Sequence, residues 1–242
     1  MIKIEDVEIN GWEAAIRGMR NPKNSWDKSD SIGYCCANAK ECERCPHGNY
    51  EDNQFVCNKY DDAYIVGDND LTLMRKLCKA GTDHRKYLRM INVTMDIAAP
   101  LYWWKEWDTY KVGTVRNSCS TMHMIAAREF VLDDFSHEHL NGHSEMILED
   151  TIKALNAERE YYLKSKDKSA WWQLIQLLPS SYNQLATVQV NYEVLMNMYH
   201  SRKAHKLDEW VRFCEWILTL PYINRLIDDK KEGENNGKNQ VL

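Results

Sequence analysis

The sequence predicts an α+β fold in which helices dominate a small sheet. Short segments with apolar residues at alternate positions lie near the start, the middle and the later part of the chain. Longer segments with apolar residues three and four positions apart separate them, which is the period of amphipathic helices. With 242 residues, of which 44% are hydrophobic, the chain is long enough to bury a substantial core.

The charge of the chain is modest and negative. Lysine and arginine total 31 against 36 aspartates and glutamates, which gives a net charge of −5 at pH 7. This balance provides no general attraction to nucleic acid or to an anionic membrane. No apolar run approaches the roughly 20 residues that cross a bilayer. The first residues also lack the hydrophobic stretch of a signal peptide. The sequence therefore predicts a cytoplasmic protein that binds neither nucleic acid nor membrane.

The first third of the chain contains three regular elements and one polar insertion. Residues 2–9 nearly alternate in polarity and predict a strand with one irregular step. Residues 11–19 predict a short helix, which an Asn-Pro pair ends. Residues 27–69 are polar, rich in cysteine and without apolar periodicity, so they predict an insertion. A helix is predicted over residues 68–81, with a capping Asp-Asn-Asp at its start and a glycine at its end.

The middle of the chain carries the clearest strand and an aromatic helix. Residues 90–97 place four apolar side chains on one face and predict a strand. Pro100 then opens a helix, because a missing N–H has no cost at the first helical position. Trp103 and Trp107 share one face of this helix, which is typical of core packing. A planar ligand with polar edges is the alternative partner of these rings. A polar tract over residues 114–120 follows and predicts a turn.

The second half of the chain is mainly helical. Helices are predicted over residues 146–163, 171–178, 192–199 and 207–220, and a short strand over residues 185–190. The last fifteen residues are polar and predict a disordered tail. The predicted organisation is one domain over residues 1–227 with the cysteine-rich insertion, followed by a tail over residues 228–242.

Five of the eight cysteines fall within the polar insertion. Cys36, Cys42, Cys45 and Cys57 include one Cys-x2-Cys pair, a spacing that occurs in tetrahedral zinc sites. Clustered cysteines without a secretory signal favour a metal over a disulfide framework. A structural zinc, with His47 as an alternative ligand, would order a segment that has little apolar content. Reduced thiols in a loop are the alternative.

Two blocks of the sequence resemble the flavin-dependent thymidylate synthases. The first block, residues 81–123, leads from a strand through Ala-Pro and an aromatic helix to a tract of small polar residues. The second block, residues 178–216, contains a Leu-Pro and a Val-Asn-x3-Leu-Met-Asn-x4-Arg run without gaps. The resemblance implies a helix-rich domain around a small, mostly antiparallel sheet.

The resemblance also implies an activity, namely the FAD-mediated methylation of dUMP or a related pyrimidine nucleotide. In that family NADPH reduces the flavin, a folate carries the one-carbon unit, and no cysteine of the protein attacks the base. The flavin sites of the family lie between the subunits of a homotetramer. FAD is therefore the implied cofactor, and a dUMP-like nucleotide, folate, NADPH and further copies of the chain are the implied partners.

Site residues follow from the matched positions. Ser120 and Arg202 are the implied catalytic and substrate-binding residues, with Ser120 near the base and Arg202 at the phosphate or the base edge. Asn191 and Asn197 match asparagines beside the flavin, whose pyrimidine edge needs both donors and acceptors. From the residues alone, Asn191 is also suited to cap the following helix, and Arg202 to complement the dipole of the helix that it ends.

Several family arginines are absent from this chain. Thr109-Tyr110-Lys111 stands where the family has Arg-His-Arg, so Tyr110 or Lys111 is the implied replacement in the contact with flavin or phosphate. Met122 and Leu185 occupy two further arginine positions, and Glu106 stands where the family has glutamine. Because arginine binds phosphate bidentately, these changes leave two alternatives open. The chain could bind or modify another nucleotide without thymidylate synthesis, or it could be a zinc-stabilised interaction protein.

Overall fold

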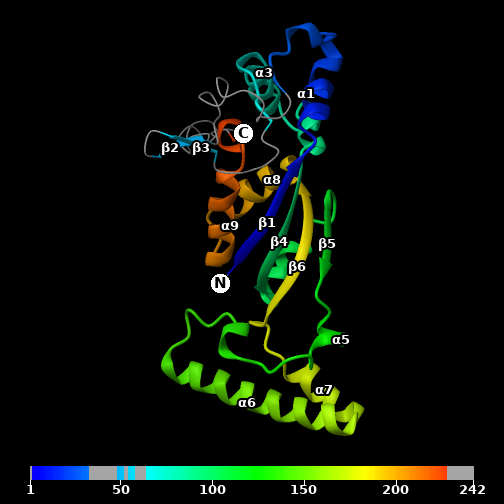
Figure 1. The fold of residues 1–242 in the computed structure, drawn as a ribbon, viewed down its shortest axis with the longest axis vertical. Coiled ribbons are helices and arrows are strands. Elements are labelled where there is room, and N and C mark those ends of the chain that lie inside the picture. Colours follow the sequence, from blue (N-terminus) through cyan, green and yellow to red (C-terminus); the bar gives the residue numbers. More distant parts are fainter. Residues whose placement is uncertain (1, 33–47, 52–53, 58–63, 228–242) are drawn as a thin grey trace, which may run out of the picture. The chain divides into compact units, whose positions relative to one another are not determined.

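The computed structural model describes residues 2–32, 48–51, 54–57 and 64–227 (Figure 1). The chain forms two compact units. The sheet unit comprises Met1–Gly11 and Arg89–Ile217, and the α1/α3 unit comprises Trp12–Leu88 and Leu218–Leu242. A single domain over residues 1–227 stays a prediction.

A four-stranded antiparallel sheet in the order β1-β4-β6-β5 forms the centre of the sheet unit. The small antiparallel sheet that the sequence predicts is therefore confirmed. The register of β1 shifts between Glu5 and Glu8, which is the irregular step in the sequence pattern. Side chains along β4 alternate between buried and half-buried, as expected from its apolar period of two. The strands are β1 (Lys3–Asn10), β4 (Asn92–Pro100), β5 (Thr114–Ser118) and β6 (Asn183–Asn191).

The polar tract after the aromatic helix is a strand rather than the predicted turn. It forms β5, which pairs with β6 from Thr114 opposite Val190 to Ser118 opposite Ala186. β5 is an edge strand with no fully buried side chain, so its sequence lacks the alternation that marks a half-buried strand.

Six α-helices and a 3-10 turn complete the described part of the sheet unit. The long helix α6 begins earlier than predicted, because the Asn141 side chain accepts a hydrogen bond from the Ser144 N–H at 3.0 Å and caps it there. Leu148, Ile152 and Leu155 of α6 pack in one apolar cluster with Leu174 of α7. The elements are α4 (Leu101–Trp107), α5 (Thr121–Met124), η4 (Leu132–Asp134), α6 (Gly142–Ser165), α7 (Lys168–Leu177), α8 (Tyr192–Arg202) and α9 (Asp208–Thr219).

The aromatic helix α4 belongs to the core. Trp103, Trp104 and Trp107 are all buried. The Trp103 ring lies 4.7 Å from that of Trp210, and the Trp107 ring lies 5.6 Å from that of Phe213, both measured between centroids. These separations are those of favourable aromatic pairs. The prediction that the tryptophans serve core packing is confirmed.

In the α1/α3 unit, the helix predicted over residues 68–81 is confirmed as α3 (Asp68–Lys79), but its capping group differs. The carboxylate of Asp30 accepts hydrogen bonds from the Asn69 N–H at 2.9 Å and the Asp70 N–H at 3.1 Å. Gly81, at φ +105°, follows the helix end as predicted. The other elements are α1 (Trp12–Arg20), η1 (Asn21–Lys23), η2 (Trp26–Lys28), the antiparallel pair β2 (Gly48–Glu51) and β3 (Gln54–Cys57), and α10 (Ile223–Leu226), while η3 (Lys86–Met90) spans the boundary between the units.

The predicted zinc ligands lie largely outside the described residues. This holds for Cys36, Cys42 and Cys45, whereas Cys57 is the last residue of β3. Within the described ranges, no group of three or more His, Cys, Asp or Glu side chains could hold a metal ion. The zinc site stays a prediction. None of the helices that the structure describes has the length and apolar character needed to span a bilayer.

Candidate functional site

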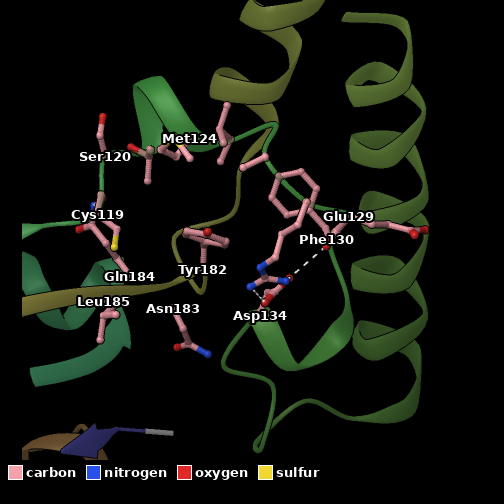
Figure 2. Close-up of a pocket in the computed structure, with 14 residues that line it drawn as sticks. Cys119, Ser120, Met124, Glu129, Phe130, Asp134, Tyr182, Asn183, Gln184 and Leu185 are labelled. Carbon is pink, nitrogen blue, oxygen red and sulfur yellow. Dashed lines mark hydrogen bonds and ion pairs between the residues drawn. The ribbon is translucent and has the colours of Figure 1, made fainter. Parts of the chain in front are cut away.

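A pocket of about 350 Å³ lies where β5 leads into α5 and where β6 begins (Figure 2). Ser120 and Cys119 lie at one side of it, and Phe130 and Asp134 at the other. The ring of Tyr182 lies between them. The volume lies within the range of small-molecule pockets. The mixture of rings, hydroxyl groups and amides suits a planar ligand with polar edges.

Ser120 is both a helix cap and a pocket residue. Its Oγ accepts a hydrogen bond from the His123 N–H at 3.2 Å, at the start of α5. The hydroxyl retains its own proton and can donate it to a ligand in the pocket. The structure thus places the implied substrate-binding serine in a pocket, and its catalytic role stays a prediction.

The charged groups of the pocket are an arginine and two acidic residues, none of which belongs to a recognisable sequence motif. Arg128 binds Asp134 bidentately, with one hydrogen bond from Nη1 to Oδ2 at 2.8 Å and a shorter one from Nη2 to Oδ1. The hydrogen bond with Asp134 raises the pKa of Arg128. Glu129 also lines the pocket, so two carboxylates accompany its one arginine. The pocket therefore has no surplus positive charge for a phosphate.

A hydrogen-bond network joins the pocket to the aromatic core. Gln184 of β6 donates from Nε2 to the Cys119 carbonyl at 2.7 Å and accepts at Oε1 from Arg116 at 2.5 Å. The guanidinium of Arg116 lies 4.0 Å from the centroid of the Trp104 ring and binds Asp108 at 2.9 Å. Gln184 is buried, and both ends of its amide are used. This network fixes the pocket wall to the sheet.

Arg202 is the centre of a second group of side chains, the Arg202 cluster, which also contains Glu106, Tyr110 and Trp210. Its Nη1 lies 2.7 Å from Glu106 Oε2, and its Nε donates to the Tyr110 hydroxyl at 3.0 Å. The guanidinium carbon lies 5.1 Å from the centroid of the Trp210 ring. Burial acts to lower the pKa of Arg202, but the bonds to Tyr110 and Glu106 outweigh it and raise the pKa. Arg202 therefore stays a cation.

The implied flavin-binding asparagines have different surroundings. Asn191 caps α8, because its Oδ1 accepts from the Val194 N–H at 3.1 Å. Its Nδ2 lies 3.5 Å from the Gly113 carbonyl, so both ends of the amide have partners within the chain. The capping role expected from the residues alone is what the structure shows. Asn197 and Lys111 are exposed.

The implied site residues thus fall in two places within one chain. The pairing of β5 with β6 begins beside Gly113 and Asn191 and ends just before Ser120. Five paired residues at about 3.3 Å each separate these ends by roughly 15–20 Å. Tyr110, which binds Arg202, precedes Gly113 by three residues. The structure therefore joins Arg202 to Tyr110 and places Ser120 at the other end of the strand.

Among the three cysteines described as free, alkylation is expected to distinguish Cys119 from the two others. Cys119 is exposed, whereas Cys78 and Cys214 are buried. Burial raises the pKa of Cys214 to about 12. On the order of one in ten thousand Cys214 thiols is then ionised at pH 8, and only the thiolate reacts. Iodoacetamide followed by peptide mass spectrometry should find Cys119 labelled first. Unfolding in urea should make Cys78 and Cys214 accessible to the reagent. If Cys214 were labelled as fast as Cys119 in the folded protein, the buried packing of α9 would be contradicted.

No model of a protein family matches this sequence, and no curated protein matches it. Solved structures of similar fold include the flavin-dependent thymidylate synthase of Helicobacter pylori complexed with FAD and dUMP. Its TM-score is 0.60 at 15% identity, over 93% of this chain and 97% of that one. A second structure of a Helicobacter pylori thymidylate synthase with FAD and dUMP also has a TM-score of 0.60, at 14% identity over 94% and 97% of the two chains. At this identity the comparison concerns the fold, and the chain has the fold of the flavin-dependent thymidylate synthases.

Proposed function

We propose that this chain is a flavin-dependent, thymidylate synthase-like enzyme that methylates dUMP or a related pyrimidine nucleotide. The pocket at Ser120 is the observation that carries this proposal. It is large enough for a small ligand, is lined by rings and hydrogen-bonding groups, and contains the serine that the resemblance places near the base. The fold supports the proposal, since both Helicobacter pylori structures are described as holding FAD and dUMP.

The chain's own residues would bind and orient the reactants. The rings of Tyr182 and Phe130 line the space for a planar base, and the Ser120 hydroxyl is available to donate to its edge. When bound, the flavin would supply the hydride for the transfer of a folate-borne carbon to the base. Asn191 and Lys111, two residues implied at the flavin, do not form a flavin-binding site within one chain. The Asn191 amide caps α8, and Lys111 is exposed. We therefore include a homo-oligomer, with sites completed by further copies, in the proposal.

Purified full-length protein tests this function directly. We expect bound or added FAD to give the flavin absorbance bands and dUMP to bind in calorimetry. Replacing Ser120 by alanine removes one neutral hydrogen bond, worth about 0.5–1.5 kcal/mol, and should weaken dUMP binding roughly two- to tenfold. Exposed Thr109→Ala is the control and should leave binding unchanged. Protein that binds neither FAD nor dUMP would contradict the proposal.

The charges of the pocket favour a second candidate function, the binding or modification of another nucleotide without thymidylate synthesis. Arg128 is already neutralised by Asp134, and Leu185 lines the pocket at a position where the family has arginine. Rescue of a thymidine auxotroph separates the two functions. Growth without thymidine supports the thymidylate synthase, whereas nucleotide binding without growth supports the second candidate.

A further inference from the structure

We propose that the α1/α3 unit contains a binding site for a free aromatic amino acid, in a pocket beside one face of α1. This pocket has a volume of about 360 Å³, which lies within the range of small-molecule sites. It is lined by residues of α1, by Trp26 and Ser29, and by Tyr64, all of which belong to this one unit. None of them lines the pocket at Ser120, so the assignment is independent of the proposed function.

The first argument is a pair of arginines that can bind a carboxylate. Arg20 is buried, with its Nε 2.6 Å from Asp70 Oδ1 and its Nη1 donating to the Ser25 carbonyl at 3.0 Å. Within the described part of the chain, its Nη2 has no hydrogen-bond partner. A buried donor without a partner costs free energy, which a ligand oxygen can recover.

Arg17 lies three positions before Arg20 and also lines the pocket. Residues three apart are neighbours on a helix surface. Arg17 is exposed and forms no ion pair or hydrogen bond with any residue that the structure describes. The two guanidinium groups can therefore donate together to one carboxylate.

The second argument is the charge of the pocket. Glu13 lines it four positions before Arg17, a spacing at which the two side chains commonly pair, yet no ion pair joins them among the described residues. Because Asp70 neutralises Arg20, the charges of Glu13 and Arg17 leave the lining without a net charge. A phosphate dianion does not match this balance. An α-amino acid does, since its ammonium group would bind Glu13 and its carboxylate the arginines.

The third argument is an aromatic wall that is open to a ligand. The Trp26 side chain is 50% exposed, and its Nε1 donates to Asn21 Oδ1 at 2.8 Å, which fixes the orientation of the ring without covering it. Ile16 and Tyr64 line the same pocket and are buried, so they provide an apolar surface next to the indole. An oriented indole beside apolar side chains favours a planar ring in the ligand. The amino acid is therefore of the aromatic class.

Calorimetry on the full-length protein tests this assignment with three ligands. L-phenylalanine carries both charged groups, 3-phenylpropionate lacks the ammonium group, and phenethylamine lacks the carboxylate. We expect saturable binding of L-phenylalanine and at least about tenfold weaker binding of each analogue, because each loses a charged hydrogen bond. Glu13→Gln should reduce the preference for L-phenylalanine over 3-phenylpropionate to less than about threefold, since the partner of the ammonium group is lost. Trp26→Ala should weaken L-phenylalanine at least about threefold.

Lys23→Gln and Asp27→Asn are the matched controls, because both residues are exposed charges of the same unit that do not line the pocket. Both variants should bind L-phenylalanine like the unchanged protein, and circular dichroism should show that every variant is folded. Analogues that bind as well as L-phenylalanine would overturn the assignment. So would a preference that Glu13→Gln does not reduce, or protein that binds inorganic phosphate but not L-phenylalanine. None of these results bears on the binding of FAD or dUMP.

Discussion

Replacing Asp70 by asparagine is expected to destabilise the α1/α3 unit by about 3–5 kcal/mol, because it leaves Arg20 as an uncompensated buried charge. Both side chains are buried, with exposed fractions of 4% for Arg20 and 0% for Asp70. Arg20 Nε lies 2.6 Å from Asp70 Oδ1. The other carboxylate oxygen accepts from the hydroxyl groups of Ser29 at 2.7 Å and Ser31 at 2.6 Å. The loop of residues 29–31 is thereby tied to α3, and asparagine cannot make the same set of bonds.

The same carboxylate predicts how the stability of this unit changes with pH. Burial acts to raise the pKa of Asp70, but hydrogen bonds from Ser31, Ser29 and Arg20 outweigh it and lower the pKa below 3.8. The group therefore stabilises the folded state fully above about pH 4. This contribution is lost as the pH falls through the lowered pKa. Asp70→Asn should remove this part of the acid dependence.

Hydrogen exchange with mass spectrometry of residues 12–32 and 64–88 measures both effects, because it reports on this unit separately. Asp150→Asn is the control. Asp150 is exposed, and its one ion pair among the described residues is with Lys153 on the helix surface, so its loss should change stability by less than about 0.5 kcal/mol. A destabilisation by Asp70→Asn below about 1 kcal/mol would show that the buried pair does not hold this unit together.

Replacing Trp103 by alanine is expected to cost about 3–5 kcal/mol in the sheet unit. Trp103 is fully buried, and its ring contacts those of Trp104, Trp107, Trp210 and Phe213 at centroid distances of 5.0, 5.3, 4.7 and 5.7 Å. Alanine leaves a cavity at the centre of these rings, which the surrounding helices cannot fill without moving.

Urea unfolding of the variant, followed by circular dichroism, measures this loss. Trp172→Ala is a matched control, because the Trp172 side chain is 44% exposed and its truncation should cost much less. Near-ultraviolet circular dichroism should show a reduced aromatic signal for Trp103→Ala. The Trp210 ring packs against the Arg202 guanidinium. Trp103→Ala should therefore also lower the affinity of any ligand that the Arg202 cluster binds. If the two variants were equally stable, the buried ring of Trp103 would not contribute to the stability of the sheet unit as proposed.

Parts of the fold follow from local sequence patterns, because burial on one face imposes a period on the chain. The alternation along Asn92–Pro100 and the apolar stripe of Gly142–Ser165 each predict the correct element. The cap role of Asn191 is equally local, since the asparagine directly precedes its helix. β5 carries no such signal, because an edge strand without buried side chains needs no alternation.

The candidate site depends more on tertiary structure. The resemblance indicates Ser120, but nothing local indicates that Arg128 and Asp134 face the same pocket. Glu106 and Arg202 are 96 positions apart by their residue numbers, and their contact arises because α4 and α8 are brought together. Such pairs leave no periodic trace in a single sequence.

The sequence by itself determined the α+β class, most of the helices, the central strand and the aromatic character of the core, because each depends on neighbours within a few residues. The tertiary structure alone decided that β5 is a strand, that Asp30 caps α3 and that Arg202 is paired with a carboxylate. Each of these depends on groups far apart in the chain, whose approach is fixed only when the whole core is packed.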